Sequence, residues 1–301
     1  MAESFAAFAP GRANLIGEHT DYNDGLALPF AIDAGVTVTA VPREGGELVA
    51  HALDRGEEDR FALAADPPTR TGDWRDFVRG AAAELQAAGY ALRPADLAIQ
   101  GGVPPGAGLG SSAALTVALC LALLAVSELP EPSERIELAR LCSRVENRWV
   151  GARTGLLDQV ASLLGEQDAA LRVDFRTLEV RRVPLELGGW RLVTVDSGER
   201  RSVAASGYNE RRSECERARE LLGLESLRDL YDASTGAVEE TVRRLRKAGA
   251  AGARIMGGGF GGHVLALLPP DAGTPEGAFE LKPSGGAHLV SGQRRSGAAG
   301  Q

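Results

Sequence analysis

The chain has 301 residues, of which 44% are apolar and 25% charged, so it can bury a sizeable core without cross-links and is not disordered as a whole. Its net charge of −8, with a pI near 5.2, argues against a nucleic-acid-binding protein, which usually carries a basic face. The chain has three scattered cysteines and no visible signal peptide, which predicts a cytoplasmic protein. It has no apolar run long enough for a bilayer, so we expect it not to enter the membrane.

The first half of the chain alternates between strand and helix patterns. Apolar residues at every second position predict strands, and apolar residues three or four positions apart predict helices. In chain order we expect strands at 36–40 and 48–53 joined across Gly45–Gly46, a helix over 74–85, a strand at 97–99, and helices from 111, over 134–150 and over 156–164. A glycine-rich loop, 101–110, precedes the helix that begins at Ser111.

The pattern changes after Gly165. We expect strands at 171–175, 178–183 and 192–195, helices over 203–222 and 237–248, and a strand at 264–268. Strands and helices are mixed irregularly, which favours an α+β fold over a doubly wound sheet. We predict an N-terminal domain over 1–165, a C-terminal domain over 166–290 and a disordered tail over 291–301.

The glycine-rich loop is the strongest local signal for ligand binding. Alternating glycines let backbone N–H groups approach an anion, and the following helix offers its N-terminus to phosphate. The candidates are Gly106, Ala107, Gly108, Leu109, Gly110, Ser111 and Ser112. Either serine could cap the helix or bind magnesium. The loop lacks the lysine of a Walker A motif and the glycine spacing of a Rossmann fingerprint. A second glycine cluster, 257–262, favours ligand binding over a simple turn.

A polar cluster lies near the N-terminus. Residues 12–21 contain a cation, two carboxylates and an imidazole, namely Arg12, Glu18, Asp21 and His19. A solvated surface loop would explain this composition, and the spacing fits no standard metal site. Carboxylates accept hydrogen bonds from hydroxyl pairs, so the cluster also suits a polyol or sugar.

Three segments, in this order, resemble a known family. Residues 12–23 are similar to the galactokinase signature, residues 104–113 to the second motif of the GHMP kinases, and residues 257–262 to the third. The string GEHTDYN at 17–23 is specific to the galactokinase branch. The resemblance implies the two-domain GHMP kinase fold. Two departures are Met256 in place of the usual threonine and a C-terminal domain shortened between 208 and 257.

The resemblance also implies roles for individual residues. It makes Asp158 the catalytic aspartate and Arg12 its partner beside the transferred phosphoryl group. Ser112 and Glu146 would bind Mg²⁺ and residues 106–112 the ATP phosphates. The sugar would contact Glu18, His19, Thr20, Asp21, Gly155 and Tyr208.

The implied reaction is ATP-dependent phosphorylation of α-D-galactose at O1, which opens the Leloir pathway of galactose metabolism. This reading agrees with the residues, because phosphoryl transfer needs mainly positioning and charge neutralisation. We expect a monomer with galactose and ATP as its partners. Two alternatives stay open: a GHMP kinase for a related sugar such as N-acetylgalactosamine, and a non-catalytic sensor of galactose and ATP.

Overall fold

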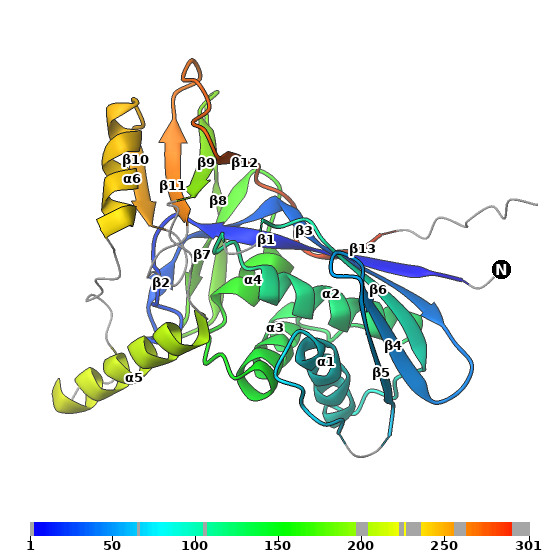
Figure 1. Cartoon of the computed structure of the whole chain (residues 1–301). Coiled ribbons are helices and arrows are strands. Elements are labelled where there is room, and N and C mark those ends of the chain that lie inside the picture. The colour runs from blue at the N-terminus through cyan, green and yellow to red at the C-terminus, as the bar shows by residue number, and fades with distance from the viewer. Residues whose placement is uncertain are drawn as a thin grey trace, which may run out of the picture.

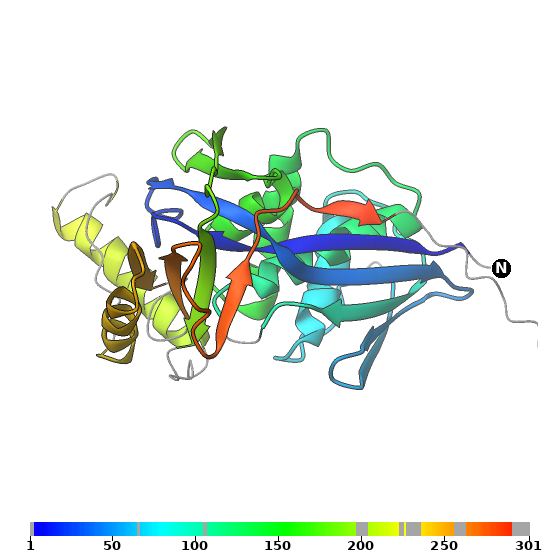
Figure 2. The same ribbon diagram turned by 90° about the horizontal axis from the view of Figure 1, so that it is seen from above.

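The computed structural model describes residues 3–64, 67–104, 107–196, 204–222, 226, 236–255 and 263–290. Two long antiparallel strands, β1 (Phe5–Asn14) and β3 (Pro29–Pro42), run along the molecule and connect its two ends (Figures 1 and 2). β1 carries Arg12 and Asn14 toward the end of the molecule where β9, β11 and β12 lie.

The two long strands belong to a six-stranded sheet with the order β13-β1-β3-β6-β4-β5. The other members are β4 (Glu47–Ala52), β5 (Glu57–Ala62), β6 (Ala95–Gly101) and β13 (His288–Val290). The expected hairpin across Gly45–Gly46 is wrong, because β6 lies between β3 and β4 and pairs in parallel with β4. β4 forms its hairpin with β5 instead.

Helices cover one face of this sheet (Figure 1). They are α1 (Arg75–Ala87), α2 (Ser111–Val126), α3 (Arg135–Arg144), the π-helix η1 (Val145–Val150) and α4 (Leu157–Leu164). α2 is apolar on almost every side and packs against β1 and β3 in the largest core cluster. A helix that is apolar all round is expected in the interior. Its buried packing fixes the position of its N-terminus, Ser111, beside the glycine-rich loop.

The expected helix over 134–150 is divided, since α3 passes into η1 at Val145. One-turn π-helices occur frequently at functional sites. The other helices predicted from the spacing are confirmed within one or two residues.

Two smaller sheets complete the chain. β2 (Leu26–Ala27), β7 (Ala169–Asp174) and β8 (Glu179–Pro184) form one. β9 (Arg191–Asp196), β10 (Gly252–Ile255), β11 (His263–Leu268) and β12 (Ala278–Leu281) form the other, in the order β10-β11-β9-β12. α6 (Gly236–Lys247) packs on β10 and β11, and α5 (Ala204–Leu222) lies at the periphery (Figure 1).

This mixture of helices and mainly antiparallel sheets confirms the α+β class. The division at Gly165 stays a prediction, and the chain crosses back over it, because β13 pairs with β1 and β7 pairs with β2. The expected tail over 291–301 lies outside the described residues. Within the described residues, no helix combines the length and apolarity needed to cross a membrane.

Candidate active site

An ion pair between Arg12 and Asp158 forms the centre of the site. Arg12 extends from β1, and Asp158 lies in the first turn of α4. Nε and Nη2 of Arg12 each lie 2.7 Å from Oδ1 of Asp158. Burial lowers the pKa of Arg12, but the charges of Asp158 and Glu18 outweigh this effect and raise it. The arginine is therefore a permanent cation. Its Nε and Nη2 both bind Oδ1, and Oδ2 of Asp158 accepts no hydrogen bond from the described residues.

The glycine-rich loop is bound directly to this ion pair. The backbone N–H of Arg12 donates to the carbonyl of Leu109 at 2.8 Å, and its Nη1 donates to the carbonyl of Gly108. Gly110 has a φ of +71°. A Cβ at this position would lie 3.1 Å from Cγ of Arg12 and 3.5 Å from Oδ2 of Asp158. Glycine therefore lets the loop approach the ion pair closely.

The N-terminus of α2 begins at this loop. Its N-cap is Gly110, and no side chain caps the helix, so the capping role considered for Ser111 or Ser112 is wrong. Uncapped N–H groups and the positive end of the helix dipole favour an anion. Gly110 thus places this uncapped helix end against Asp158. Gly106 of the predicted phosphate loop lies outside the described residues.

A second carboxylate, Glu146 of η1, is buried close to the first. Nε2 of Gln159 donates to its Oε1 at 3.0 Å, and the hydroxyl of Thr154 donates to its Oε2 at 3.4 Å. Burial and the charge of Asp158 raise the pKa of Glu146 to about 8. The described residues contain no group of three or more His, Cys, Asp or Glu side chains that could bind a metal by themselves. A cation here would need additional oxygen ligands, such as phosphate and water.

Asp21 forms part of the opposite side of the site. Its Oδ2 accepts a hydrogen bond from the backbone N–H of Leu157 at 3.2 Å. A Cβ at residue 155 would lie 2.1 Å from the same oxygen, so a larger residue there would displace the Asp21 side chain. Burial, with the charges of Asp158 and Glu18, raises the pKa of Asp21 to about 6. Asp21 and Gly155, which we predicted as sugar contacts, are therefore in direct contact with each other.

Three rings lie beside this pair. Nδ1 of His19 lies 2.5 Å from the hydroxyl of Tyr22. The ring of Tyr208, on α5, lies 5.0 Å from that of His19 and 5.6 Å from that of Tyr22. Burial raises the pKa of the Tyr208 hydroxyl, as does the charge of Asp21. The structure thus brings a residue from the C-terminal half against the N-terminal motif.

The remaining residues of the motif bind protein groups. The carboxylate of Asp21 faces the site. The hydroxyl of Thr20 instead donates to the carbonyl of Gly17 at 2.8 Å and closes the turn. Oε1 of Glu18 lies 3.0 Å from Nη2 of Arg254, which extends from β10. Nη1 of Arg254 also donates to the carbonyl of Asn14, at 3.0 Å. Glu18 and Arg254 therefore connect the N-terminal motif to the second half of the chain.

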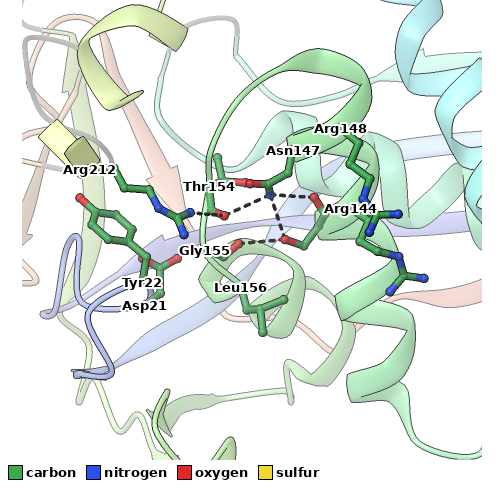
Figure 3. Close-up of a pocket in the computed structure, with 10 residues that line it drawn as sticks. Asp21, Tyr22, Arg144, Asn147, Arg148, Thr154, Gly155, Leu156 and Arg212 are labelled. Atoms are coloured by element: carbon green, nitrogen blue, oxygen red, sulfur yellow. Dashed lines mark hydrogen bonds between the residues drawn. The ribbon is translucent and has the colours of Figure 1, made fainter. Parts of the chain in front are cut away.

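A cavity of about 270 Å³ adjoins the Asp21 side of the site (Figure 3). Its lining consists of Asp21, Tyr22, Ser143, Arg144, Asn147, Arg148, Thr154, Gly155, Leu156 and Arg212. The side chain of Asn147 fixes the loop that forms one wall, since Nδ2 donates to the carbonyls of Ser143 and Thr154 at 2.8 and 3.1 Å. Arg12 and Asp158 do not line this cavity.

Sequence reasoning missed several of these residues. Tyr22 lies inside the N-terminal motif and was not selected, although its ring contacts both His19 and Tyr208. Arg254 stands in a region with no motif, so nothing in the sequence pattern marks it. The second glycine cluster, 257–262, and Met256 lie outside the described residues.

Comparison with protein families assigns most of the chain. Residues 76–166 match the GHMP kinases N terminal domain, and residues 211–276 match the GHMP kinases C terminal family. Residues 1–42 match the galactokinase galactose-binding signature.

Relatives and solved structures agree with these matches. A galactokinase of Thermotoga neapolitana is 32% identical over 328 residues, covering 90% of each chain, and one of Thermotoga petrophila is 33% identical, covering 86% of this chain and 88% of the relative. The structure of Lactococcus lactis galactokinase complexed with galactose matches with a TM-score of 0.84 and 26% identity over 95% of each chain. Methanococcus jannaschii mevalonate kinase, at 17% identity over 94% of this chain and 98% of its own, shares the fold, with a TM-score of 0.67.

The alignment with the Thermotoga neapolitana relative runs over 328 residues, more than the 301 of this chain, so the relative contains residues that this chain lacks. The 32% identity is nevertheless spread over 90% of both chains and so extends far beyond any single motif. Together with the matched signature at residues 1–42, it shows that the chain belongs to the galactokinase family of the GHMP kinases.

Proposed function

We propose that this protein transfers the γ-phosphoryl group of ATP to O1 of α-D-galactose and releases galactose 1-phosphate and ADP. The observation that carries this proposal is the Arg12–Asp158 ion pair, placed between the N-terminus of α2 and the polar motif around Asp21. A galactokinase solved with galactose has the same fold, which supports galactose as the acceptor.

Asp158 is the proposed general base. Its Oδ2 is the carboxylate oxygen that Arg12 does not bind, so it can accept the proton of the O1 hydroxyl as that oxygen attacks the γ-phosphorus. Arg12 orients the Asp158 carboxylate and stabilises charge on the transferred group. The bond from the γ-phosphorus to the β,γ-bridging oxygen breaks, and ADP leaves with the electron pair. Residues 106–112 would bind the phosphates, through loop N–H groups and the α2 N-terminus.

The sugar would be held by groups on two sides. Asp21, Glu18 and His19 would accept from or donate to its hydroxyl groups, and Gly155 would contribute its backbone. Tyr208 would close the pocket from α5. Thr20 would contribute indirectly, because its hydroxyl donates to the carbonyl of Gly17 and so fixes the shape of the motif.

Ser112 and Glu146 would hold Mg²⁺ with the ATP phosphates. The residues fit a divalent cation, because Glu146 is a buried carboxylate near Asp158 that accepts hydrogen bonds from neutral groups, those of Gln159 and Thr154, and whose pKa is raised to about 8. A bound cation would keep Glu146 ionised and supply charge neutralisation for the triphosphate. Ser112, in the first turn of α2, offers a neutral oxygen at the phosphate-binding end.

The test is ADP release measured with Mg²⁺–ATP and a panel of sugars. Buried polar groups reject an analogue that leaves them unpaired, so kcat/KM for galactose should exceed that for glucose, its C4 epimer, at least about a hundredfold. Preference for N-acetylgalactosamine would identify a kinase for a related sugar. Absence of turnover, with both ligands bound, would identify a sensor.

The variant Asp158→Asn tests the role of Asp158 as the general base. It should lose at least about a hundredfold in kcat, the usual range for a general base, while its KM for ATP stays near that of the wild type. Asp96→Asn is the matched control, since Asp96, at the start of β6, also pairs with an arginine, Arg43, at 3.0 Å. Retention of more than about a tenth of kcat by Asp158→Asn would contradict the role of the base.

The last two parts of the proposal are the cellular compartment and the oligomeric state. Cys120, Cys142 and Cys215 are all unpaired and buried, which supports a reducing compartment such as the cytoplasm. The monomeric state remains a prediction, to be measured by light scattering.

A further inference from the structure

α5 carries Tyr208 into the site, where its ring lies against those of His19 and Tyr22, and Cys215 of the same helix is buried. None of the three core clusters found among the described residues includes a side chain of α5. Leu221, near its C-terminal end, is 78% exposed, and that end projects away from the sheets (Figure 1). Contacts outside these clusters therefore fix the position of Tyr208.

Polar contacts join the first turns of α5 to the loop 151–154. The side chain of Asn209 acts at both ends of this loop, since its Oδ1 accepts from the N–H of Arg153 at 2.8 Å and its Nδ2 donates to the carbonyl of Gly151 at 2.9 Å. Nη1 of Arg212 donates to the carbonyl of Arg153, also at 2.8 Å.

An ion pair completes this connection. Nη2 of Arg153 lies 2.7 Å from both carboxylate oxygens of Glu216, and Nε of Arg212 lies 3.3 Å from one of them. The guanidinium of Arg212 also lies over the ring of Tyr22, 5.4 Å from its centroid, at the edge of the cavity (Figure 3). The carboxylate of Glu216 thus pairs with both arginines, and Arg212 also contacts the N-terminal motif.

We propose that Arg153, Asn209, Arg212 and Glu216 form a polar clasp that positions Tyr208 for the sugar. This inference rests on the proposed function. The clasp connects three elements that carry predicted sugar contacts: the motif with His19 and Asp21, the loop that ends at Gly155, and α5. These four residues are positioning residues, since each acts through the backbone or through another ring.

The clasp acts on the sugar and leaves the nucleotide site unchanged. The phosphate-binding end of α2 is fixed by its burial in the largest core cluster and by Arg12, neither of which involves α5. Weakening the clasp should therefore lower the affinity for galactose without changing that for ATP.

Glu216→Gln tests the ion pair, and Glu214→Gln is its matched control. Glu214 lies on the same helix and pairs with Arg211 at 3.1 Å, outside the clasp. The Glu216 carboxylate is 39% exposed, so loss of its charge should raise the galactose KM by about fivefold, the upper range for a half-exposed pair. Asn209→Ala should raise it by about tenfold, because two backbone groups lose their partners. The ATP KM and kcat should stay within about twofold of the wild type.

Arg153→Lys and hydrogen exchange distinguish positioning from loss of fold. Lysine keeps the charge and can contact Glu216 through one nitrogen, as Nη2 of Arg153 does, but it loses the second hydrogen bond, from Nη1 to the hydroxyl of Ser213 at 2.9 Å. Its effect should therefore be smaller than that of Arg153→Ala. Amide exchange of residues 208–222, measured without sugar, should accelerate in Glu216→Gln and Asn209→Ala but not in Glu214→Gln.

The outcomes separate this inference from the proposed function. Unchanged exchange in both clasp variants, or equal rises in the galactose and ATP KM, would overturn the clasp. A wild-type protein that does not phosphorylate galactose would overturn the proposed function instead. In that case, galactose affinity measured by calorimetry still decides the clasp: a loss in Glu216→Gln but not in Glu214→Gln supports it, and equal affinities reject it.

Discussion

Asp21 is a carboxylate whose ionisation is opposed by the surrounding site. Burial, with the charges of Asp158 and Glu18, raises its pKa to about 6, against the hydrogen bond from Leu157 and the charge of Arg12, which lower it. The folded protein therefore binds this proton more tightly than the unfolded chain, where the pKa is 3.8. The resulting stabilisation is present below about pH 4 and is lost as the pH rises through about 6.

Asp21→Asn removes this titration while keeping an oxygen for the N–H of Leu157. We expect the free energy of unfolding of the wild type, relative to Asp21→Asn, to fall by roughly 3 kcal/mol between pH 4 and pH 7. Urea denaturation of both proteins at several pH values measures this difference, and common effects of acid cancel. A difference that does not change with pH would show that Asp21 titrates normally.

At the residue scale, the sequence predicted which side chains meet only where a motif brought them together. Arg12 and Asp158 are 146 positions apart, and their pairing came from the family resemblance, since no spacing rule connects β1 to α4. Arg153, Arg212 and Glu216 gave no signal, because a charge in a loop or on a helix is solvated in most proteins. Their partners depend on how α5 lies against a loop, which is a tertiary contact.

At the element scale, the turn from the glycine-rich loop into α2 depends on one residue. Gly110 has a positive φ, and a Cβ there would contact Arg12 and face Asp158. Gly110→Ala should lose about 1–2 kcal/mol of stability from the backbone alone. It should also lower kcat more than tenfold, because a displacement of the ion pair misplaces the base.

Gly56→Ala provides the control for this backbone effect. Gly56 has a φ of +65°, close to the +71° of Gly110, but a Cβ there would meet nothing within 4 Å. Both variants should lose similar stability in thermal melts, and only Gly110→Ala should lose activity in the ADP-release assay. Equal activity of the two variants would show that the space around Gly110 is not used in catalysis.

Periodicity predicted the helices better than the strand order. α1 and α4 follow their apolar spacing, and α2 follows an apolar run that Thr116 interrupts. The insertion of β6 between β3 and β4 was not predictable, because pairing partners in a sheet are set by tertiary contacts rather than by local pattern. β1 was missed, since its polar residues are buried by the loop and helix of the site and interrupt the alternation expected of a strand.

At the scale of the whole molecule, the apolar core is unevenly distributed. The largest cluster fills the space between the six-stranded sheet and α1–α4, whereas two smaller clusters support the remainder. The second cluster joins the two halves, since it packs Ile32 and Leu109 with Leu192 and Leu265. Arg254–Glu18 and the clasp at Arg153–Glu216 add polar connections. Such contacts contribute less than an equal number of buried apolar side chains.

We expect ligands that contact both halves to add measurably to the stability of the protein. A ligand at a hundred times its Kd stabilises the native state by about 2.7 kcal/mol, which for a chain of this size raises Tm by roughly 4 °C. Galactose and Mg²⁺–ATP should each produce such a shift in a thermal melt. Glucose at the same concentration is the matched control, since it differs only at C4 and should shift Tm far less. A stable protein that shows neither shift nor turnover would mean that the residues missing relative to its relatives were required for the sugar site.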